Sequence, residues 1–83
     1  MPFDPAKDAA NFRKHGVSLA RASDMDIRVV VPDNRIEYGE PRFRAFGTLD
    51  GESFCLVFTV RDGEARSISF RRAHLKEYKR YVP

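Results

Sequence analysis

Basic residues near the carboxyl-terminal end of the chain are of types that suit chemistry on a phosphate group. Seven basic and three acidic residues follow residue 60, and this stretch accounts for the whole surplus in a net charge of +3. The fork of an arginine guanidinium matches two phosphate oxygens at once. The stretch therefore predicts a surface for a polyanion or an acidic partner, with a solvated helix face as the plain alternative.

Candidates for proton transfer lie in the same stretch. His74 follows Arg71 by three residues and precedes Tyr78 by four, so a helix starting near Arg71 places all three on one side. Histidine titrates near neutral pH and suits acid–base work, although a lone histidine also serves structural roles. Further candidates are Glu40, Tyr81 and His15, the last of which also fits a helix-capping role.

Metal and thiol chemistry are not expected. The two histidines, His15 and His74, have no ligand spacing between them or to other residues, so the sequence predicts no metal site and no cofactor. The single cysteine, Cys55, stands inside an apolar run, where a buried and inert thiol is the expected state. A single cysteine excludes a disulfide within the chain.

A central hairpin over residues 53–70 is expected to position these side chains. The run from residue 53 to 60 is apolar on both faces of a strand, and Asp62-Gly63 is a typical pair for a tight turn. If the second strand reaches residue 71, simple alternation places Ser67, Ser69 and Arg71 on one face. Arg66, Ile68 and Phe70 then share the other face, which makes Arg71 the better phosphate ligand.

The other elements follow from caps and turn residues. Asp4 and Pro5 predict a helix that ends at Gly16, and its core-facing residues are expected to be Ala6, Ala9, Ala10 and Phe12. A short second helix follows from Ser18 to about Ser23. Strands are expected over 27–31 and 42–49, a polar loop over 33–41, a tight turn at Asp50-Gly51 and a terminal helix with Leu75, Tyr78 and Val82 on one side.

The expected architecture is a small α+β domain spanning residues 1–83. It is an antiparallel β-sheet meander with two N-terminal helices and a C-terminal helix. No apolar run approaches the length of a membrane span, and the first residues do not form a signal peptide, so we expect a cytoplasmic protein without membrane contact. The core of an 83-residue chain is modest, which favours a partner or a dimer.

Several blocks of sequence resemble one known family over nearly the full length. They are Phe3-Asp4-Pro5 with Lys7 and Asn11, Lys14-His15-Gly16-Val17-Ser18, Gly39-Glu40 with Arg42-Phe43, Val57-Phe58-Thr59, Arg66-Ser67-Ile68-Ser69 with Arg71-Arg72-Ala73, and Lys76-Glu77 with Tyr78 or Tyr81. In this order the chain resembles a BrnT-type toxin of a type II toxin–antitoxin system. Phe70 stands where the family pattern usually has a small residue, which predicts a bulkier surface beside Arg71.

The resemblance implies a RelE-like ribonuclease fold and a metal-independent RNA endonuclease in which a ribose 2′-OH attacks the adjacent phosphorus. It also implies a cognate BrnA-type antitoxin, contact with operator DNA only through the antitoxin complex, and a hetero-oligomer built as a dimer of heterodimers. The alternatives are an inactive relative that binds antitoxin or RNA without cleavage, and a basic domain that simply binds RNA.

That reaction needs a base, an acid and cations around the phosphorus. The residues expected to supply them are Arg71, Arg72, His74, Arg61, Tyr78 and Glu40. The residues expected to contact RNA around the site are Lys14, Arg42, Arg44, Lys76, Lys79 and Arg80.

Overall fold

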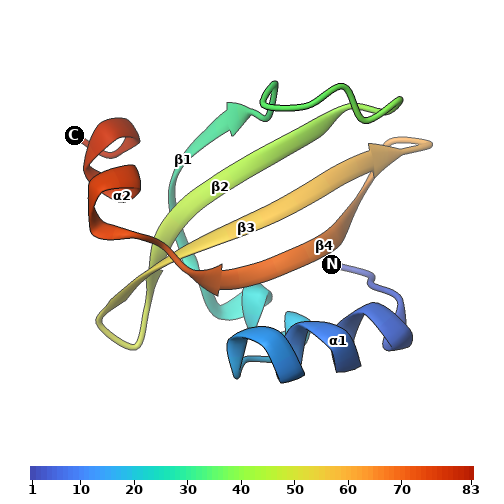
Figure 1. Cartoon of the computed structure of the whole chain (residues 1–83), viewed down its shortest axis with the longest axis horizontal. Helices are drawn as coiled ribbons and strands as arrows, with labels where there is room; N and C mark the ends of the chain where they lie inside the picture. Colours follow the sequence, from blue (N-terminus) through green and yellow to red (C-terminus); the bar gives the residue numbers. More distant parts are fainter.

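The computed structural model describes all 83 residues as one four-stranded sheet with helices on both sides (Figure 1). The elements are α1 (Pro5–His15), the 3₁₀ helix η1 (Leu19–Asp24), β1 (Asp26–Pro32), β2 (Arg42–Leu49), β3 (Glu52–Arg61), β4 (Glu64–Arg72) and α2 (Leu75–Tyr81). The strands pair antiparallel in sequence order. The predicted α+β class and meander are thus confirmed.

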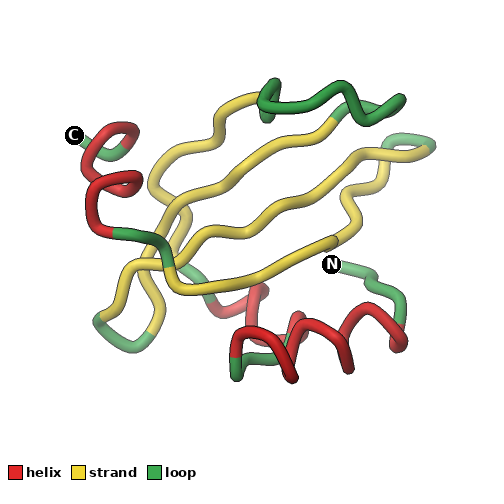
Figure 2. Tube along the Cα trace, in the orientation of Figure 1, coloured by secondary structure: helices red, strands yellow, loops and turns green.

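Both predicted tight turns are present. Asp50 and Gly51 have φ values of 52° and 77°, and Asp62 and Gly63 have 53° and 77°. Positive φ at both central residues is the geometry of a primed hairpin turn, whose twist matches that of the flanking strands. Figure 2 shows these two short connections and the longer loop between β1 and β2. The turns set the register of β2, β3 and β4.

Helix α1 has the predicted caps. The Asp4 side chain accepts a hydrogen bond from the Ala6 N–H at 2.8 Å, and Gly16 takes the left-handed conformation, with φ 74°, at the other end. The predicted buried face is wrong. Ala6, Ala9, Ala10 and Phe12 are all exposed, Phe12 by 58%, whereas Asn11 is only 6% exposed.

Asn11 is buried because α1 runs along the edge of β4. Its Nδ2 donates to the Phe70 carbonyl at 2.8 Å and to the Val17 carbonyl at 2.9 Å, and its Oδ1 accepts from the Phe70 N–H at 3.0 Å. The Ser67 N–H donates to the Pro2 carbonyl at 3.0 Å. Buried backbone groups need such partners, so an amide outcompetes an aromatic ring at this place. We call this pairing of Asn11 with Phe70 the Asn11 clasp.

The apolar core lies between the sheet and the N-terminal helices. Its buried members are Leu19, Ala22, Met25, Ala45, Leu49, Phe54, Leu56 and Phe70. Phe70 is fully buried and stacks on Phe54 with ring centroids 4.8 Å apart. The expected bulkier surface beside Arg71 is therefore wrong, because Phe70 points to the core face and Arg71 to the opposite one.

A bulge in β4 changes which side chains share a face. Val57 pairs with Ser69, but Phe58 pairs with Ser67, so Ile68 is an extra residue. Beyond a bulge the alternation is inverted. The predicted face for Ser67 is therefore wrong, since it lies on the Phe70 side. Arg66, opposite Thr59, lies on the Arg71 side.

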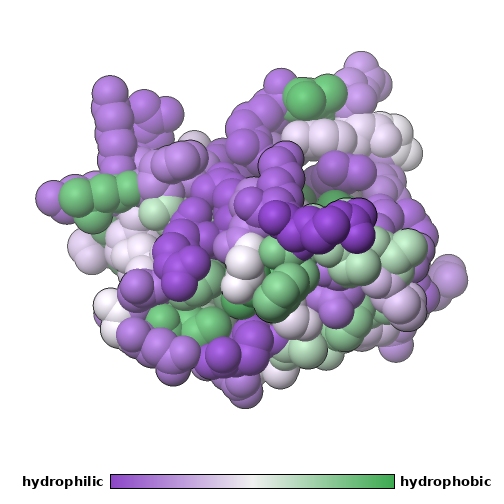
Figure 3. Space-filling model, turned by 60° about the horizontal axis from the view of Figure 1, so that its bottom comes forward, coloured by the Kyte–Doolittle hydropathy of each residue, from purple (hydrophilic) through white to green (hydrophobic).

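The outer surface on the α1 side is mixed. Figure 3 brings this side forward and shows apolar side chains in small patches between hydrophilic ones. None of the helices is both long enough and apolar enough to cross a membrane.

Candidate functional site

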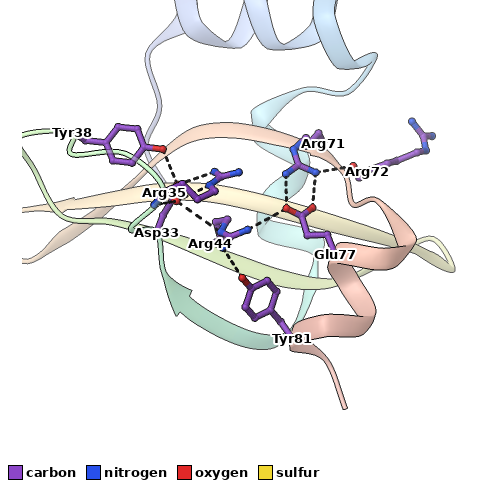
Figure 4. A network of polar contacts seen from close by, with 8 residues as sticks. All are labelled: Asp33, Arg35, Tyr38, Arg44, Arg71, Arg72, Glu77 and Tyr81. Atoms are coloured by element: carbon purple, nitrogen blue, oxygen red, sulfur yellow. Dashed lines mark hydrogen bonds and ion pairs between the residues drawn. The ribbon is translucent and has the colours of Figure 1, made fainter.

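The face of the sheet opposite the apolar core carries a network of charged side chains centred on Glu77 of α2 (Figure 4). Arg71 Nη1 donates to Oε1 at 3.0 Å and its Nη2 donates to Oε2 at 3.1 Å. Arg44 Nη1 also donates to Oε2, at 3.1 Å. Two arginines from β4 and β2 thus converge on one carboxylate, because residues 44 and 71 lie on the same face of the sheet.

Arg44 is the most enclosed cation of this network, with 6% of its surface exposed. Its Nη2 donates to the Tyr81 hydroxyl at 3.0 Å, and its guanidinium lies 4.9 Å from the centre of the Tyr81 ring. Tyr81 in turn stacks on Phe46 with centroids 5.2 Å apart. The Nε of Arg44 is buried and has no hydrogen-bond partner. A buried donor without a partner is unusual and costly.

Asp33 forms a second carboxylate centre at the start of the loop after β1. It accepts from Arg35 Nε at 2.7 Å and Nη2 at 2.9 Å, and from the Tyr38 hydroxyl at 3.2 Å. The hydrogen bonds from Arg35 lower the pKa of Asp33 to about 2, against the opposing effect of burial. Asp33 Oδ1 also lies 4.0 Å from Arg44 Nε, so it links the loop to the sheet.

A pocket of about 450 Å³ opens between these groups and α2. It is lined by Arg35, Arg44, His74, Lys76, Glu77, Arg80 and Tyr81. We call it the α2 pocket. Four of its seven side chains are permanent cations and one is a histidine, against a single carboxylate. Such a balance suits a polyanionic ligand.

Two groups in the α2 pocket have shifted pKa values. Burial alone would raise the pKa of Glu77, but the hydrogen bonds from Arg71 and the charge of Arg44 outweigh it and lower the pKa. The hydrogen bond from Arg44, followed by its charge, lowers the pKa of Tyr81. Glu77 is therefore a charged carboxylate at neutral pH, and the Tyr81 hydroxyl is a stronger acid than an ordinary tyrosine.

The structure brings about half of the predicted site residues together here. The α2 pocket is lined by the predicted residues Arg44, His74, Lys76 and Arg80, and Arg71 adjoins it through Glu77. Tyr78, also predicted, does not line the pocket and meets Phe46 edge-on, with centroids 6.5 Å apart. Lys79 lies on α2 outside the lining.

Arg72 and Lys14 lie on the other side of β4. Arg72 pairs with Phe54 in the register, which places it on the core face, and its Nε donates to Glu52 at 2.6 Å. Lys14 borders a shallow hollow between α1 and Ser69. His15 lines the same hollow, and burial together with the charges of Lys14 and Arg71 lowers its pKa.

Arg61, Glu40 and Arg42 gather at the opposite end of the sheet from α2. Arg61 Nη2 donates to Glu40 at 3.0 Å, and the Arg42 guanidinium lies 4.1 Å from the Tyr38 ring centre. Arg61 is six positions along β3 from the partner of Arg71, which corresponds to about 20 Å. Arg61 and Arg71 therefore lie far apart on the sheet.

Four residues of the network were not predicted from the sequence as site residues: Glu77 at its centre, and Asp33, Arg35 and Tyr38. Asp33, Arg35 and Tyr38 lie in the loop, where the pattern favoured only a turn and a polar connection. The only sequence signal for these loop residues was an acidic and a basic residue two positions apart, Asp33 and Arg35, at the end of a strand. Such a pair indicates a site residue only once the loop is known to fold back against Arg44.

The buried thiol agrees with expectation. Cys55 is fully buried, and burial raises its pKa to about 11, which keeps the thiol protonated and unreactive. No group of three or more His, Cys, Asp or Glu side chains is arranged to hold a metal ion.

Comparison with known proteins agrees with the resemblance found in the sequence. Residues 3–77 match the family described as the ribonuclease toxin BrnT of type II toxin–antitoxin systems. No curated protein and no solved structure matches the chain. The matched span includes every strand, α1 and Glu77. The chain belongs to the BrnT family of ribonuclease toxins of type II toxin–antitoxin systems.

Proposed function

We propose that this chain is a metal-independent RNA endonuclease whose reaction centre is the α2 pocket. The observation that carries the proposal is the convergence of Arg44, Arg71 and the cationic residues of α2 around one cavity. Arginine and lysine held in a partly enclosed site stabilise the charge that develops on a phosphorus under attack. The family supplies the reaction class, and the pocket supplies groups of the right kind.

In this reaction a ribose 2′-oxygen forms a bond to phosphorus while the bond from phosphorus to the 5′-oxygen breaks. The proton of the 2′-OH passes to a base, and an acid protonates the leaving 5′-oxygen. His74 is an exposed imidazole at the rim of the pocket and is our candidate base. Tyr81, whose pKa Arg44 lowers, is our candidate acid. The products are a 2′,3′-cyclic phosphate and a 5′-hydroxyl end.

We further propose that a cognate antitoxin neutralises the chain by covering the α2 pocket. The family description implies an antitoxin partner. An acidic or RNA-like surface would match the four cations of the pocket. The assembled complex is then the hetero-oligomer, a dimer of heterodimers, that contacts operator DNA.

The test is cleavage of a defined RNA by the purified chain in the presence of EDTA, with analysis of the product ends. We expect His74→Ala to lower kcat by a factor of about 10² to 10⁴. We expect the Lys76→Ala/Arg80→Ala variant to raise KM, because it removes two cations from the pocket. The control is Arg13→Ala/Arg28→Ala, which removes two exposed cations on α1 and β1.

Equal cleavage by all four proteins would remove the α2 pocket from the mechanism. If the folded chain cuts no RNA and does not arrest growth when expressed in bacteria, the alternative of an inactive antitoxin-binding module replaces the proposal.

A further inference from the structure

The contacts of Glu77 describe an anion-binding site that is filled by the protein itself. We propose that the Glu77 carboxylate occupies the position of a phosphate group of the RNA, and that the Glu77 side chain swings aside when this phosphate binds. The inference rests on the proposed function, because it names the place in the α2 pocket where the substrate phosphodiester binds.

The geometry of the donors supports a phosphate ligand. Arg71 holds the two carboxylate oxygens with its two Nη atoms, at 3.0 and 3.1 Å, and Arg44 adds a third donor at 3.1 Å to Oε2. A fork that grips two oxygens on one central atom is also the way in which arginine binds phosphate. Both arginines come from the sheet, so the donors stay in place if the Glu77 side chain moves.

The site has more donors than a carboxylate satisfies. Arg44 is more than nine-tenths buried, and three donor atoms, Nη1 of Arg44 and both Nη of Arg71, meet at the carboxylate. Glu77 brings two oxygens, both already used by the Nη atoms of the two arginines. A phosphodiester brings further oxygens around a tetrahedral centre. Three donors on two oxygens therefore suit a phosphate better than a carboxylate.

Helix α2 has few anchors besides this contact, so it can adjust when the Glu77 side chain moves. It has seven residues, none of them buried, and His74 at its N-cap makes no side-chain capping bond. Leu75, the one aliphatic side chain within α2, is 65% exposed. The remaining anchors are the rings of Tyr78 and Tyr81 against Phe46 and the hydrogen bond from Arg44 to the Tyr81 hydroxyl. So short a helix depends on tertiary contacts. These anchors do not involve Glu77, so they keep α2 at the pocket when an anion replaces the Glu77 carboxylate.

The test compares Glu77→Gln with the intact chain and with Glu52→Gln as a matched control. Glu52 also pairs with an arginine, Arg72, but lies outside the α2 pocket. Both variants remove one negative charge, so the control corrects for the general attraction of RNA. The probe is an all-2′-deoxy oligonucleotide, which has the phosphates but no 2′-OH and cannot be cleaved by the proposed route.

We expect Glu77→Gln to bind the probe about tenfold more tightly than Glu52→Gln. The neutral amide of the Glu77→Gln variant accepts weaker hydrogen bonds from Arg44 and Arg71 than the Glu77 carboxylate does, so it competes less with a phosphate of the probe. Binding equal to that of the control, or weaker, would overturn the inference and make Glu77 a positioning residue for the two arginines.

A second measurement tests the inference even if the variants are less stable than the intact chain. Glu77→Ala leaves two arginines without their carboxylate, so inorganic phosphate should raise its melting temperature more than that of the intact chain or of Glu52→Ala. Equal shifts in the three proteins would contradict the proposal.

The two proposals fail in different ways. If no protein cleaves RNA but Glu77→Gln still binds the deoxy probe more tightly, the phosphate site stands and the nuclease proposal falls. If the intact chain cleaves RNA but Glu77→Gln gains no affinity, only the phosphate-site inference falls.

Discussion

On one face of the sheet Leu56 and Phe70 are buried among apolar side chains, whereas on the other face Arg44 and Arg71 are enclosed with Glu77. Burial of apolar surface stabilises a fold directly. Burial of charges contributes little net stability, because the cost of removing them from water offsets their attraction. The comparison indicates that the apolar face contributes most of the stability and that the charged network on the other face contributes little.

The largest effect on the apolar face is expected from Phe70→Ala. Phe70 is fully buried and stacks on Phe54, so truncation leaves a cavity and should lower the free energy of unfolding by about 3 to 5 kcal/mol. Urea unfolding followed by circular dichroism measures the change. A loss below about 1 kcal/mol would mean that the apolar face is not the main source of stability.

A smaller loss is expected from Asn11→Ala. The variant leaves the Phe70 N–H and C=O and the Val17 C=O without their side-chain partner. Unpaired buried groups cost about 1 to 3 kcal/mol each, and water can reach some of them at a sheet edge, so we expect a total of about 2 to 4 kcal/mol. Faster hydrogen exchange of the Phe70 amide should accompany it, with Asn34→Ala in the exposed loop as the control.

Acid should weaken the polar face selectively. The pKa of Asp33 is lowered from 3.8 to about 2, so its contribution is complete above pH 3.8 and disappears as the pH falls toward 2. The shift corresponds to about 2 kcal/mol. The pKa of Glu77 is lowered in the same sense. The apolar core cluster contains no ionisable side chain, so acid should leave its contribution unchanged.

Unfolding measured in urea between pH 5 and pH 2 tests this expectation. Asp33→Asn should flatten the pH dependence by about 2 kcal/mol, whatever its stability at neutral pH. The same pH dependence in both proteins would show that Asp33 does not carry the effect.

The smallest effect on stability is expected from Arg72→Ala. This variant tests whether residues on the core face of β4 contribute to RNA cleavage. Arg72 is exposed and pairs with an exposed Glu52, so its loss should cost less than about 1 kcal/mol. Because Arg72 lies on the core face, RNA cleavage should fall much less than in Arg71→Ala. Equal loss of cleavage in the two variants would extend the reaction centre around the β4 edge.

Much of the fold could be predicted from local sequence. The caps Asp4 and Gly16 and the turn pairs at Asp50 and Asp62 act within a few residues, and each is present as expected. The bulge at Ile68 could not be predicted, because it depends on how β4 pairs with β3. The burial of Asn11 likewise depends on a strand edge that is 59 residues away in sequence.

The candidate site was predictable only in part, for the same reason. Arg71, His74 and Lys76 are close in sequence, so the pattern could group them. Arg44 and Glu77 are 33 residues apart, and Asp33 reaches them only through the folded loop. The charge pattern of the sequence also placed Arg61 in the same predicted site as Arg71, although Arg61 is six positions along β3 from the residue that pairs with Arg71.

The Asn11 clasp also limits how copies of this chain can associate. A sheet grows from one molecule to the next when both of its edges are free. Here Asn11 and the Pro2 carbonyl occupy backbone groups on the outer side of β4, and only β1 presents an uncovered edge. Two copies joined edge to edge through β1 would leave no further edge for a third. We therefore expect edge-to-edge strand pairing between folded copies to end at a pair.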